Sequence, residues 1–389
     1  MTRQTRIEVD LDAIVHNAGV LAEAAAPAGL CAVVKANGYG HGAVASARAA
    51  LAGGAVMLGV ASVEEGAELR AADVEAPILV LGPQPPDSMR LAVANGLELV
   101  VTSATELAAV SAAHCSGAPP ARVHLMVDTG MRRVGVEPAD VLELHAVAAS
   151  LDGVEVAAVA THFARADEPD DPTTDTQLAR FRVALDSLRT AGGKVPLIHA
   201  ANSAAAITRA DARFGLVRCG ISLYGLPPSP ELETHEVVRR LRPALRLLSA
   251  ISFVKQVPAG EGVNYGHRFV THRPSTLATV PVGYGDGVPR GLGLAGGAAL
   301  VGGVRRPIVG AVTMDQLVLD CTDGPPVGVG DEVVLIGAQP AAERAAEPES
   351  VVAGEWARLM NTINYEIVTR LAARPPRHHL GTGGTPALR

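Results

Sequence analysis

The sequence predicts an α/β protein made of an N-terminal (β/α)8 TIM-like barrel and a C-terminal, mainly-β domain. Between Asp10 and Gly225, eight short apolar runs alternate with segments of helical periodicity. After residue 243 the pattern changes to short, β-branched runs separated by Gly and Pro. Strands that alternate with helices are typical of a parallel sheet, and eight such units close a barrel.

The eight predicted strands are apolar and short, as expected for buried strands. They cover residues 30–35, 57–61, 78–81, 98–101, 122–127, 156–161, 197–200 and 216–221. Helices are predicted where Ala, Leu and Glu dominate and a Ser or Asp can cap the start, as at 63–71, 104–113 and 174–190.

The second domain is predicted from the runs ALRLLSAISFVKQV, STLATVPVGYGDG, RRPIVGAVTM and DEVVLIG, which lie between glycine and proline turns. We expect residues 9–238 to form the barrel, and residues 239–389 together with 1–8 to form the β domain. Residues 226–243, which are rich in proline and mixed charges, are predicted to be a linker. Residues 339–350 are expected to be an exposed loop, and 381–389 a frayed tail.

Length, charge and hydrophobicity exclude several classes of protein. A length of 389 residues accommodates both domains. The net charge of −7, without a dense Lys/Arg run, argues against a nucleic-acid partner. The first residues lack the apolar stretch of a secretory signal. The sequence also contains no run of about 18 apolar residues, the length needed to span a membrane. A cytoplasmic protein is therefore expected.

The cysteines are widely spaced and show no metal-ligand pattern, so we expect no metal site. All four are predicted to be small core residues: Cys31, Cys115, Cys219 and Cys321.

Lys35 is the first candidate for chemistry, because it lies in VVKANGYGHG at the exit of a predicted buried strand. Burial there disfavours the ammonium form and lowers the pKa of the amine, and only the neutral amine attacks a carbonyl. The alternative is a strand-end lysine that reaches solvent along its stem.

Further polar residues follow the other predicted strands, and in a barrel of this kind the carboxyl ends of the strands form the active site. They are Asp128 and Arg133 after the fifth strand, His162 after the sixth, Asn202 and Ser203 after the seventh, and Arg218 and Gly220 near the eighth. Each alone has a structural explanation, such as a core histidine, a salt-bridging arginine or a helix cap. Their shared position favours a common site.

With these features together, the chain resembles the bacterial alanine racemases, which use pyridoxal 5′-phosphate (PLP). The resemblance runs from about Ile7 to Arg374. It is carried by AVVKANGYGHG, DTGMRRVG, THFARAD, HAANSAA and VRCGISLYG in the barrel, and by NYGHRF, VGYGDGVPR, TMDQ and INYEIVTRL in the second domain.

The resemblance implies a role for each matching residue. Lys35 would attach covalently to PLP and then act as an acid or base at the substrate Cα. Arg218 would face the pyridine nitrogen and keep it unprotonated, because arginine does not release its proton; this would weaken the electron sink and suppress transamination. The remaining cofactor contacts would come from Tyr39, Arg133, His162, Asn202, Ser203, Gly220, Ile221 and Tyr365.

Racemisation needs a second base on the opposite face of Cα, and the resemblance assigns that role to Tyr265 of the partner in a homodimer with shared active sites. A phenol ionises near pH 10, so it needs help from a hydrogen-bonded group, for which His162 is the candidate. Arg133 would bind the cofactor or the substrate carboxylate. The substrate end of the site would be shaped by Tyr284, Thr313 and Met314.

Several positions depart from the family pattern. Met126 stands where a lysine, often carbamylated, commonly orients the arginine, so we hypothesise that another acceptor or a bound anion holds Arg133. The other departures are Gly38 for alanine, Cys219 for proline, Asn264 for serine and Thr313 for cysteine. Asn264 and Thr313 adjoin predicted substrate-site residues and therefore bear on substrate preference.

The implied function is interconversion of L- and D-alanine, which supplies D-alanine for peptidoglycan. One alternative is racemisation of another small amino acid, such as serine, in a specialised pathway. A noncatalytic PLP-binding protein of the single-barrel kind is a third possibility, although such proteins lack the β domain. A two-domain decarboxylase would need a Gly-rich phosphate loop and a Cys-Asp pair, which we do not find.

Overall fold

The structure is a computed structural model that describes residues 4–194, 196–340 and 348–381. The chain divides into two compact units. One consists of Leu11–Pro243, and the other combines the strand that ends at Asp10 with Ala244–Gly381.

The first unit is built around a closed barrel of eight parallel strands, which confirms the predicted fold class. Its strands are β2 (Gly29–Val33), β3 (Met57–Val60), β4 (Ile78–Val80), β5 (Glu98–Val101), β6 (Ala121–Met126), β7 (Val154–Ala160), β8 (Leu197–His199) and β9 (Leu216–Cys219). Each overlaps one of the predicted strands. Closure comes from the pairing of β9 with β2.

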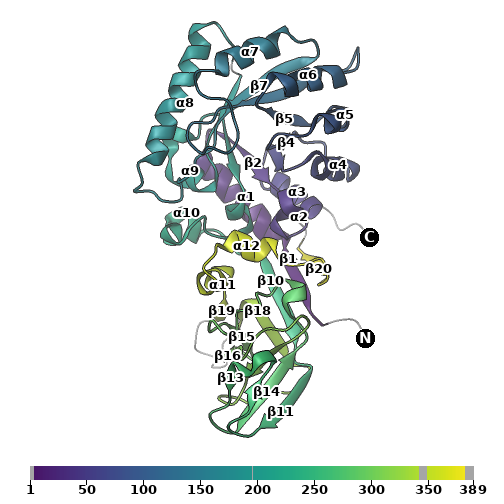
Figure 1. The fold of residues 1–389 in the computed structure, drawn as a ribbon, viewed down its shortest axis with the longest axis vertical. Coiled ribbons are helices and arrows are strands. Elements are labelled where there is room, and N and C mark those ends of the chain that lie inside the picture. The colour runs from purple at the N-terminus through teal and green to yellow at the C-terminus, as the bar shows by residue number, and fades with distance from the viewer. Residues whose placement is uncertain (1–3, 195, 341–347, 382–389) are drawn as a thin grey trace. The chain divides into compact units, whose positions relative to one another are not determined.

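Helices alternate with these strands and lie outside them, as Figure 1 shows for α4 to α8. The helical segments of this unit are α1 (Leu11–Ala25), α2 (Lys35–Tyr39, a single left-handed turn), α3 (Ala43–Ala52), α4 (Val63–Ala71), α5 (Met89–Ala94), α6 (Ala104–Ala113), α7 (Val141–Ser150), α8 (Thr173–Thr190), α9 (Ser203–Thr208) and α10 (Glu236–Arg239). Short 3₁₀ turns are η1 (Pro86–Ser88), η2 (Ala210–Ala212), η3 (Ile221–Tyr224) and η4 (Pro230–Leu232).

Local sequence explains where the predicted helices begin. The Ser62 side chain accepts a hydrogen bond from the Glu65 amide at the start of α4, and Ser103 does the same for Glu106 at the start of α6. This Ser-x-x-Glu pattern satisfies amides that the first helical turn leaves without partners.

The barrel interior is filled by alternate residues of the strands, because successive side chains in a strand point to opposite faces. Its apolar cluster consists of Cys31, Met57, Leu79, Val100, Met126, Ala160 and Leu216. Met126 is buried in this cluster, so the position at which the family commonly carries a lysine is apolar here.

The second unit is mainly β. Its largest sheet has the order β16-β15-β18-β10-β1-β20, with β19 paired to β18, and a smaller sheet has the order β11-β14-β17. The strands are β1 (Arg6–Asp10), β10 (Leu245–Ala250), β11 (Phe253–Val257), β12 (Gly262–Val263), β13 (Phe269–Val270), β14 (Ser275–Val280), β15 (Ala298–Val301), β16 (Val304–Pro307), β17 (Leu317–Asp320), β18 (Glu332–Gln339), β19 (Glu349–Val351) and β20 (Arg377–Leu380). The helical segments are η5 (Tyr265–His267), η6 (Tyr284–Asp286), α11 (Ala353–Leu359) and α12 (Asn364–Thr369).

The prediction of a linker at 226–243 is wrong. This segment contains η4 and α10, and it belongs to the first unit. The Asn17 side chain on α1 explains why: Nδ2 donates to the Arg242 carbonyl at 2.8 Å, and Oδ1 accepts from the Arg242 amide at 2.8 Å. The polar composition of the segment concealed this long-range anchoring.

Two smaller predictions also need correction. Cys115 is exposed, whereas the other three cysteines are buried as predicted. The predicted loop at 339–350 overlaps strand residues at both ends, since Gln339 closes β18 and Glu349 opens β19. Residues 341–347, and 382–389 of the predicted tail, lie outside the described residues.

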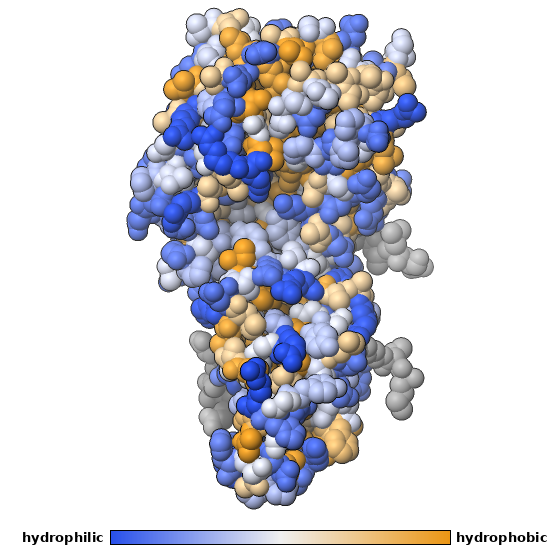
Figure 2. Space-filling model, in the orientation of Figure 1, coloured by the Kyte–Doolittle hydropathy of each residue, from blue (hydrophilic) through white to orange (hydrophobic). Residues whose placement is uncertain are grey.

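No helix among the described residues has the length and hydrophobicity to cross a membrane. In the same residues, no group of three His, Cys, Asp or Glu side chains is placed to hold a metal ion. On the face shown in Figure 2, hydrophilic residues are interspersed with hydrophobic ones over both units.

Candidate functional site

Lys35 is presented by an unusual left-handed turn directly after β2. The φ angles of Ala36, Asn37, Gly38 and Tyr39 are 52°, 53°, 61° and 51°. Each non-glycine residue in this region costs about 1–2 kcal/mol. Contacts that hold the turn include a hydrogen bond of 2.7 Å from the Ala36 amide to Oε1 of Glu65 on α4. The position of Lys35 is therefore fixed by its neighbours rather than by its own propensity.

The Lys35 amine is half-buried and has no hydrogen-bond partner in the described parts of the chain. Burial lowers its pKa, and the positive charges of Arg133 and Arg218 lower it further, against an opposing effect of Glu65. These effects favour the neutral amine, which is the nucleophilic form.

Tyr39, Ser203 and Gly220 form a small buried cradle. The Gly220 amide donates to Ser203 Oγ at 2.9 Å, and a Cβ atom on Gly220 would lie 2.4 Å from Tyr39 Oη. Burial raises the pKa of Tyr39 to about 12, so its hydroxyl keeps its proton and can donate. Ile221 follows directly and is buried as well. The hydroxyls of Ser203 and Tyr39 are donors of the kind that suits a phosphate group.

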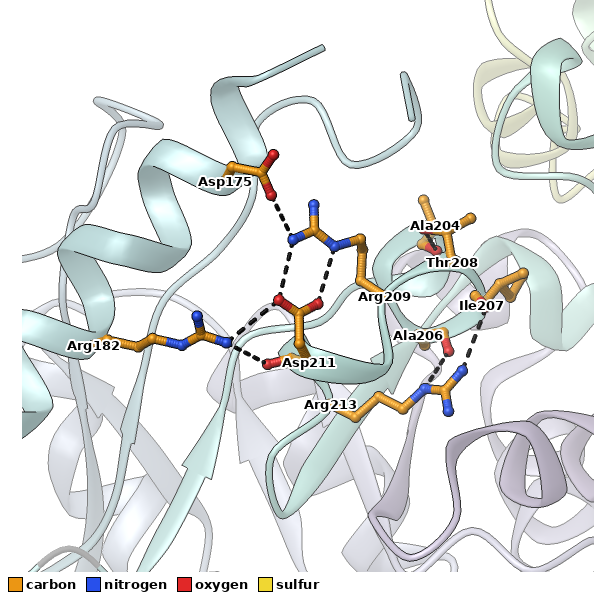
Figure 3. Close-up of polar contacts among 9 residues, drawn as sticks. All are labelled: Asp175, Arg182, Ala204, Ala206, Ile207, Thr208, Arg209, Asp211 and Arg213. Carbon is orange, nitrogen blue, oxygen red and sulfur yellow. Dashed lines mark hydrogen bonds and ion pairs between the residues drawn. The ribbon is translucent and has the colours of Figure 1, made fainter. Parts of the chain in front are cut away.

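The helix that carries Ser203, α9, is held at both ends. At its start Asn202 Oδ1 accepts from the Ala205 amide at 3.0 Å, so that side-chain oxygen serves as a helix cap. At its end Arg213 donates to the carbonyls of Ala206 and Ile207 at 2.9 and 3.4 Å, as Figure 3 shows. The cradle thus rests on a short but well-supported helix.

Ion pairs tie the segment that follows α9 to the neighbouring helix α8. Asp211 pairs with Arg209 and with Arg182, and Arg209 also pairs with Asp175 (Figure 3). All four side chains are partly exposed, so these pairs contribute little stability individually. Together they define the path of the chain between α9 and β9.

Arg218 on β9 is buried and held by four hydrogen bonds. Nη1 donates to His199 Nδ1 at 2.7 Å, and Nη2 donates to His162 Nδ1 at 2.9 Å and to the carbonyls of Thr161 and Ala200 at 2.9 and 3.1 Å. Burial lowers its pKa to about 10, which leaves the guanidinium charged at neutral pH. Its Nε has no acceptor among the described residues, so it can donate to a ring nitrogen.

His162 lies just beyond β7 and is half-buried. Burial and the charges of Arg218, Arg133 and Lys35 hold its pKa well below the usual value, so the imidazole is neutral. Because Nδ1 accepts from Arg218, the single proton of the ring is on Nε2. His162 therefore offers a donor on the side away from Arg218.

The segment after β6 brings a result that the sequence did not indicate. Asp128 Oδ1 accepts from the amides of Gly130 and Arg132, so this carboxylate closes its own turn. Arg133 is exposed and makes no hydrogen bond or ion pair with the residues that the structure describes. Those residues supply no substitute acceptor for Arg133 of the kind hypothesised from the sequence.

The predicted substrate-side residues gather in the second unit. Tyr265, Tyr284 and Met314 are 74%, 42% and 53% exposed. Hydrogen bonds connect their segments: the Tyr284 amide donates to the Thr313 carbonyl at 2.9 Å, and the side chain of Asn264 donates to the Ala311 carbonyl at 3.1 Å. We call Tyr265, Tyr284, Thr313 and Met314 the exposed tyrosine face.

The predicted residues thus fall into two groups, one in each unit. The barrel group contains Lys35 and the residues around Arg218, and the second unit holds the exposed tyrosine face. Tyr365 lies on α12 of the second unit and is half-buried.

Sequence reasoning missed three residues that lie behind Arg218. They are polar side chains within otherwise apolar strands: Glu98, His124 and His199. That placement was the available signal, because a polar residue at an inward strand position needs a partner.

Comparisons with known proteins agree along the whole chain. The family model "Alanine racemase, N-terminal domain" matches residues 9–228, and "Alanine racemase, C-terminal domain" matches residues 244–379. An alanine racemase of Thermobifida fusca is 45% identical over 387 residues, which cover 98% of this chain and 99% of that protein.

Solved structures are similarly close. The crystal structure of alanine racemase from a D-cycloserine-producing Streptomyces lavendulae has a TM-score of 0.89 and 41% identity, covering 98% of each chain. The alanine racemase of Bartonella henselae with covalently bound PLP has a TM-score of 0.85 and 29% identity, covering 97% of this chain and all of that one. The presence of the C-terminal domain overturns the single-barrel alternative, and the full-length matches overturn the decarboxylase alternative. This chain belongs to the alanine racemase family.

Proposed function

We propose that this chain interconverts L- and D-alanine with PLP held by the barrel group, and that Lys35 and Tyr265 exchange the Cα proton. The observation that carries the proposal is the half-buried amine of Lys35, which has no hydrogen-bond partner among the described residues and whose pKa is lowered by burial and by the charge of the buried Arg218. Such a pair suits covalent capture of an aldehyde and recognition of a ring nitrogen.

The barrel residues fit PLP. The cradle of Tyr39, Ser203 and Gly220, with the adjoining Ile221, would hold the phosphate, and Tyr365 is the proposed contact from α12. The Lys35 amine would bind the aldehyde carbon. When bound, PLP supplies the electron sink for the electron pair that remains when the Cα proton leaves.

Arg218 would orient the ring through Nε. Its charge is maintained by a pKa of about 10, and its two terminal nitrogens are already occupied by protein acceptors. A permanent donor at the ring nitrogen leaves that nitrogen unprotonated, which favours return of the proton to Cα over transamination.

Racemisation then requires two proton transfers on opposite faces of Cα. In one direction Lys35 accepts the proton and the partner subunit's Tyr265 returns one, and in the other direction the roles are exchanged. His162 would stabilise the phenolate with its Nε2 proton, since Nδ1 is committed to Arg218. Arg133, which is exposed, would bind a carboxylate or the cofactor phenol oxygen.

A homodimer with shared sites is part of the proposal. Support comes from the exposed tyrosine face, where two large aromatic side chains and a methionine lie unburied in a single subunit. Exposed apolar groups of this kind mark interaction surfaces. We infer that this face completes the site of a second copy.

Alanine, rather than serine, fits the substrate end. The Thr313 hydroxyl donates to the Gln316 carbonyl at 2.9 Å and accepts from the Gln316 amide at 3.1 Å, so its single proton is used within its own turn. A substrate hydroxyl would find no spare donor there. The D-alanine formed would supply peptidoglycan synthesis.

The first test is chiral analysis of the PLP-loaded enzyme incubated separately with L-alanine and L-serine. Rapid formation of D-alanine with little D-serine is the expected result. A preference for serine would reject the substrate assignment, and PLP binding without turnover would reject the enzyme assignment.

The shared site is tested by mixing inactive Lys35→Ala and Tyr265→Phe subunits after dissociation. If Tyr265 acts across the interface, one site of each heterodimer carries both lesions and the other carries neither, so about half of the activity per heterodimer returns. If Tyr265 acts within its own subunit, both sites are damaged and no activity returns.

A further inference from the structure

A chain of hydrogen bonds runs through the barrel interior behind Arg218. Glu98 Oε2 lies 2.7 Å from His124 Nε2, His124 Nδ1 lies 2.8 Å from His199 Nε2, and Arg218 Nη1 lies 2.7 Å from His199 Nδ1. Both histidines are fully buried, and Glu98 and Arg218 are 5% exposed each. We call Glu98, His124 and His199 the buried relay.

The relay residues occupy inward positions of three strands. Glu98, His124 and His199 each lie two residues from an apolar residue of the interior, namely Val100, Met126 and Leu197. Since side chains alternate along a strand, these polar groups share the interior with the apolar cluster. Water is not needed to satisfy them, because each ring nitrogen already has a partner.

The direction of each bond in the relay can be followed from Arg218. A guanidinium only donates, so His199 Nδ1 must accept. Burial holds the pKa of His199 well below the usual value, so the ring is neutral and its proton is on Nε2. His199 then donates to His124 Nδ1, and His124, whose pKa is also lowered by burial, carries its own proton on Nε2. That proton is donated to the Glu98 carboxylate.

Glu98 closes the relay as an acceptor. Its second oxygen, Oε1, accepts from Nε of Arg122 at 2.9 Å, and Arg122 is half-exposed and also pairs with Glu155. The hydrogen bond from His124 and the charge of Arg122 lower the pKa of Glu98 against the opposing effect of burial. A carboxylate thus lies at one end of two neutral imidazoles, and the guanidinium lies at the other.

We propose that Glu98 is a positioning residue for the racemase reaction: through His124 and His199 it sets the tautomers that hold Arg218 in the orientation needed by the cofactor ring. This inference deepens the proposed function and rests on it for its catalytic part. The tautomers themselves are a property of the protein and can be examined separately.

The effect of losing Glu98 follows from the bond directions. Without an acceptor, the Nε2 proton of His124 would be buried and unsatisfied, so the Nδ1 tautomer becomes preferable. With its proton on Nδ1, His124 would donate to His199 Nε2. His199 Nε2 would then have to accept, so the proton of His199 would move to Nδ1. Arg218 Nη1 would then face another donor and would have to move.

Two variants of Glu98 distinguish the role of its acceptor oxygen from the role of its negative charge. Glu98→Leu removes both, whereas Glu98→Gln keeps an acceptor oxygen and removes only the charge. Glu155→Gln is the matched control, because it alters an exposed ion pair with the same arginine and leaves the relay intact.

The direct measurement is ¹⁵N NMR of histidine-labelled, PLP-loaded enzyme, in which the ring-nitrogen shifts report the tautomer of His124 and His199. We expect the Nε2-protonated form at both positions in the unaltered enzyme, in Glu98→Gln and in Glu155→Gln. In Glu98→Leu we expect a change of tautomer, a fall in kcat/KM on the order of tenfold or more, and a larger share of turnovers that end in transamination.

The outcomes are distinguishable. An Nδ1 proton on either histidine of the unaltered enzyme overturns the inference, even if Glu98→Leu fails to fold. A folded Glu98→Leu enzyme with unchanged kcat/KM and unchanged transamination also overturns it. If the tautomers are as expected but no racemisation occurs, the proposed function fails and the assigned bond directions remain.

Discussion

Replacement of Gly220 by alanine tests the proposed phosphate cradle at a single atom. The added Cβ would lie 2.4 Å from Tyr39 Oη and 2.9 Å from Tyr39 Cζ. Ordinary contacts begin at about 3.4 Å, so the tyrosine hydroxyl must retreat by roughly 1 Å. Since Tyr39 is buried, little space is available for that movement.

The expected cost is a weakened phosphate contact. A hydrogen bond to a charged group contributes about 1.5–3 kcal/mol. Its loss raises the dissociation constant for PLP by about 10- to 100-fold, because every 1.4 kcal/mol is a factor of ten. Overpacking also lowers the stability of the protein by about 1–3 kcal/mol.

The assay is titration of the cofactor-free enzyme with PLP, followed by absorbance and accompanied by thermal unfolding. Gly82→Ala is the control, because no described atom lies within 4 Å of its added Cβ and its φ is ordinary. Gly220→Ala protein that binds PLP as tightly as this control would refute the cradle. If Gly220→Ala weakens PLP binding by displacing the Tyr39 hydroxyl, it should have little further effect on PLP affinity in a Tyr39→Phe background. In that background the contact between the hydroxyl and the phosphate is already lost.

Three other predictions concern supporting contacts. Arg213→Ala should lower the free energy of unfolding by about 1–2 kcal/mol, because α9 loses two capping hydrogen bonds; an unchanged urea midpoint would contradict this. Arg374→Ala should lower the free energy of unfolding and raise KM for L-alanine, because Arg374 joins the buried carboxylate of Asp286 in the Tyr284 turn to Asp315 beside Met314. Urea denaturation and steady-state kinetics test the two effects. Acid should destabilise the fold below pH 6.5, where imidazoles bind protons in the unfolded chain but not in the folded one, with a limiting slope of about 4 kcal/mol per pH unit. A free energy of unfolding that does not change between pH 6.5 and 5.5 would exclude such an effect from His124, His162 and His199.

The sequence was sufficient to predict the barrel because its strands are continuous apolar runs, and a buried parallel sheet requires that pattern. It also predicted that His162 and Arg218 come together, since the carboxyl ends of the strands in a barrel lie on one side. The hydrogen bond of 2.9 Å between Arg218 and His162 joins two of these ends.

What the sequence could not predict depends on contacts between distant residues. The anchoring of Arg242 by Asn17 joins positions far apart in the chain and is invisible in local composition. Glu98, His124 and His199 become neighbours only when the barrel closes. The left-handed turn after Lys35 was hidden too, because Ala36 and Tyr39 would ordinarily take other conformations.

The left-handed turn has a consequence for local motion. Ala36, Asn37 and Tyr39 together hold several kcal/mol of unfavourable backbone energy, which contacts such as that of Glu65 with the Ala36 amide offset. Backbone strain of this kind favours local opening of a segment over unfolding of the whole domain. We therefore expect the amides of this turn to exchange with solvent hydrogen while the eight strands stay paired. Lys35, the residue that would bind the cofactor covalently, begins this strained turn. A change of conformation in the turn can therefore make room for a bulky ligand while the strands of the barrel stay paired.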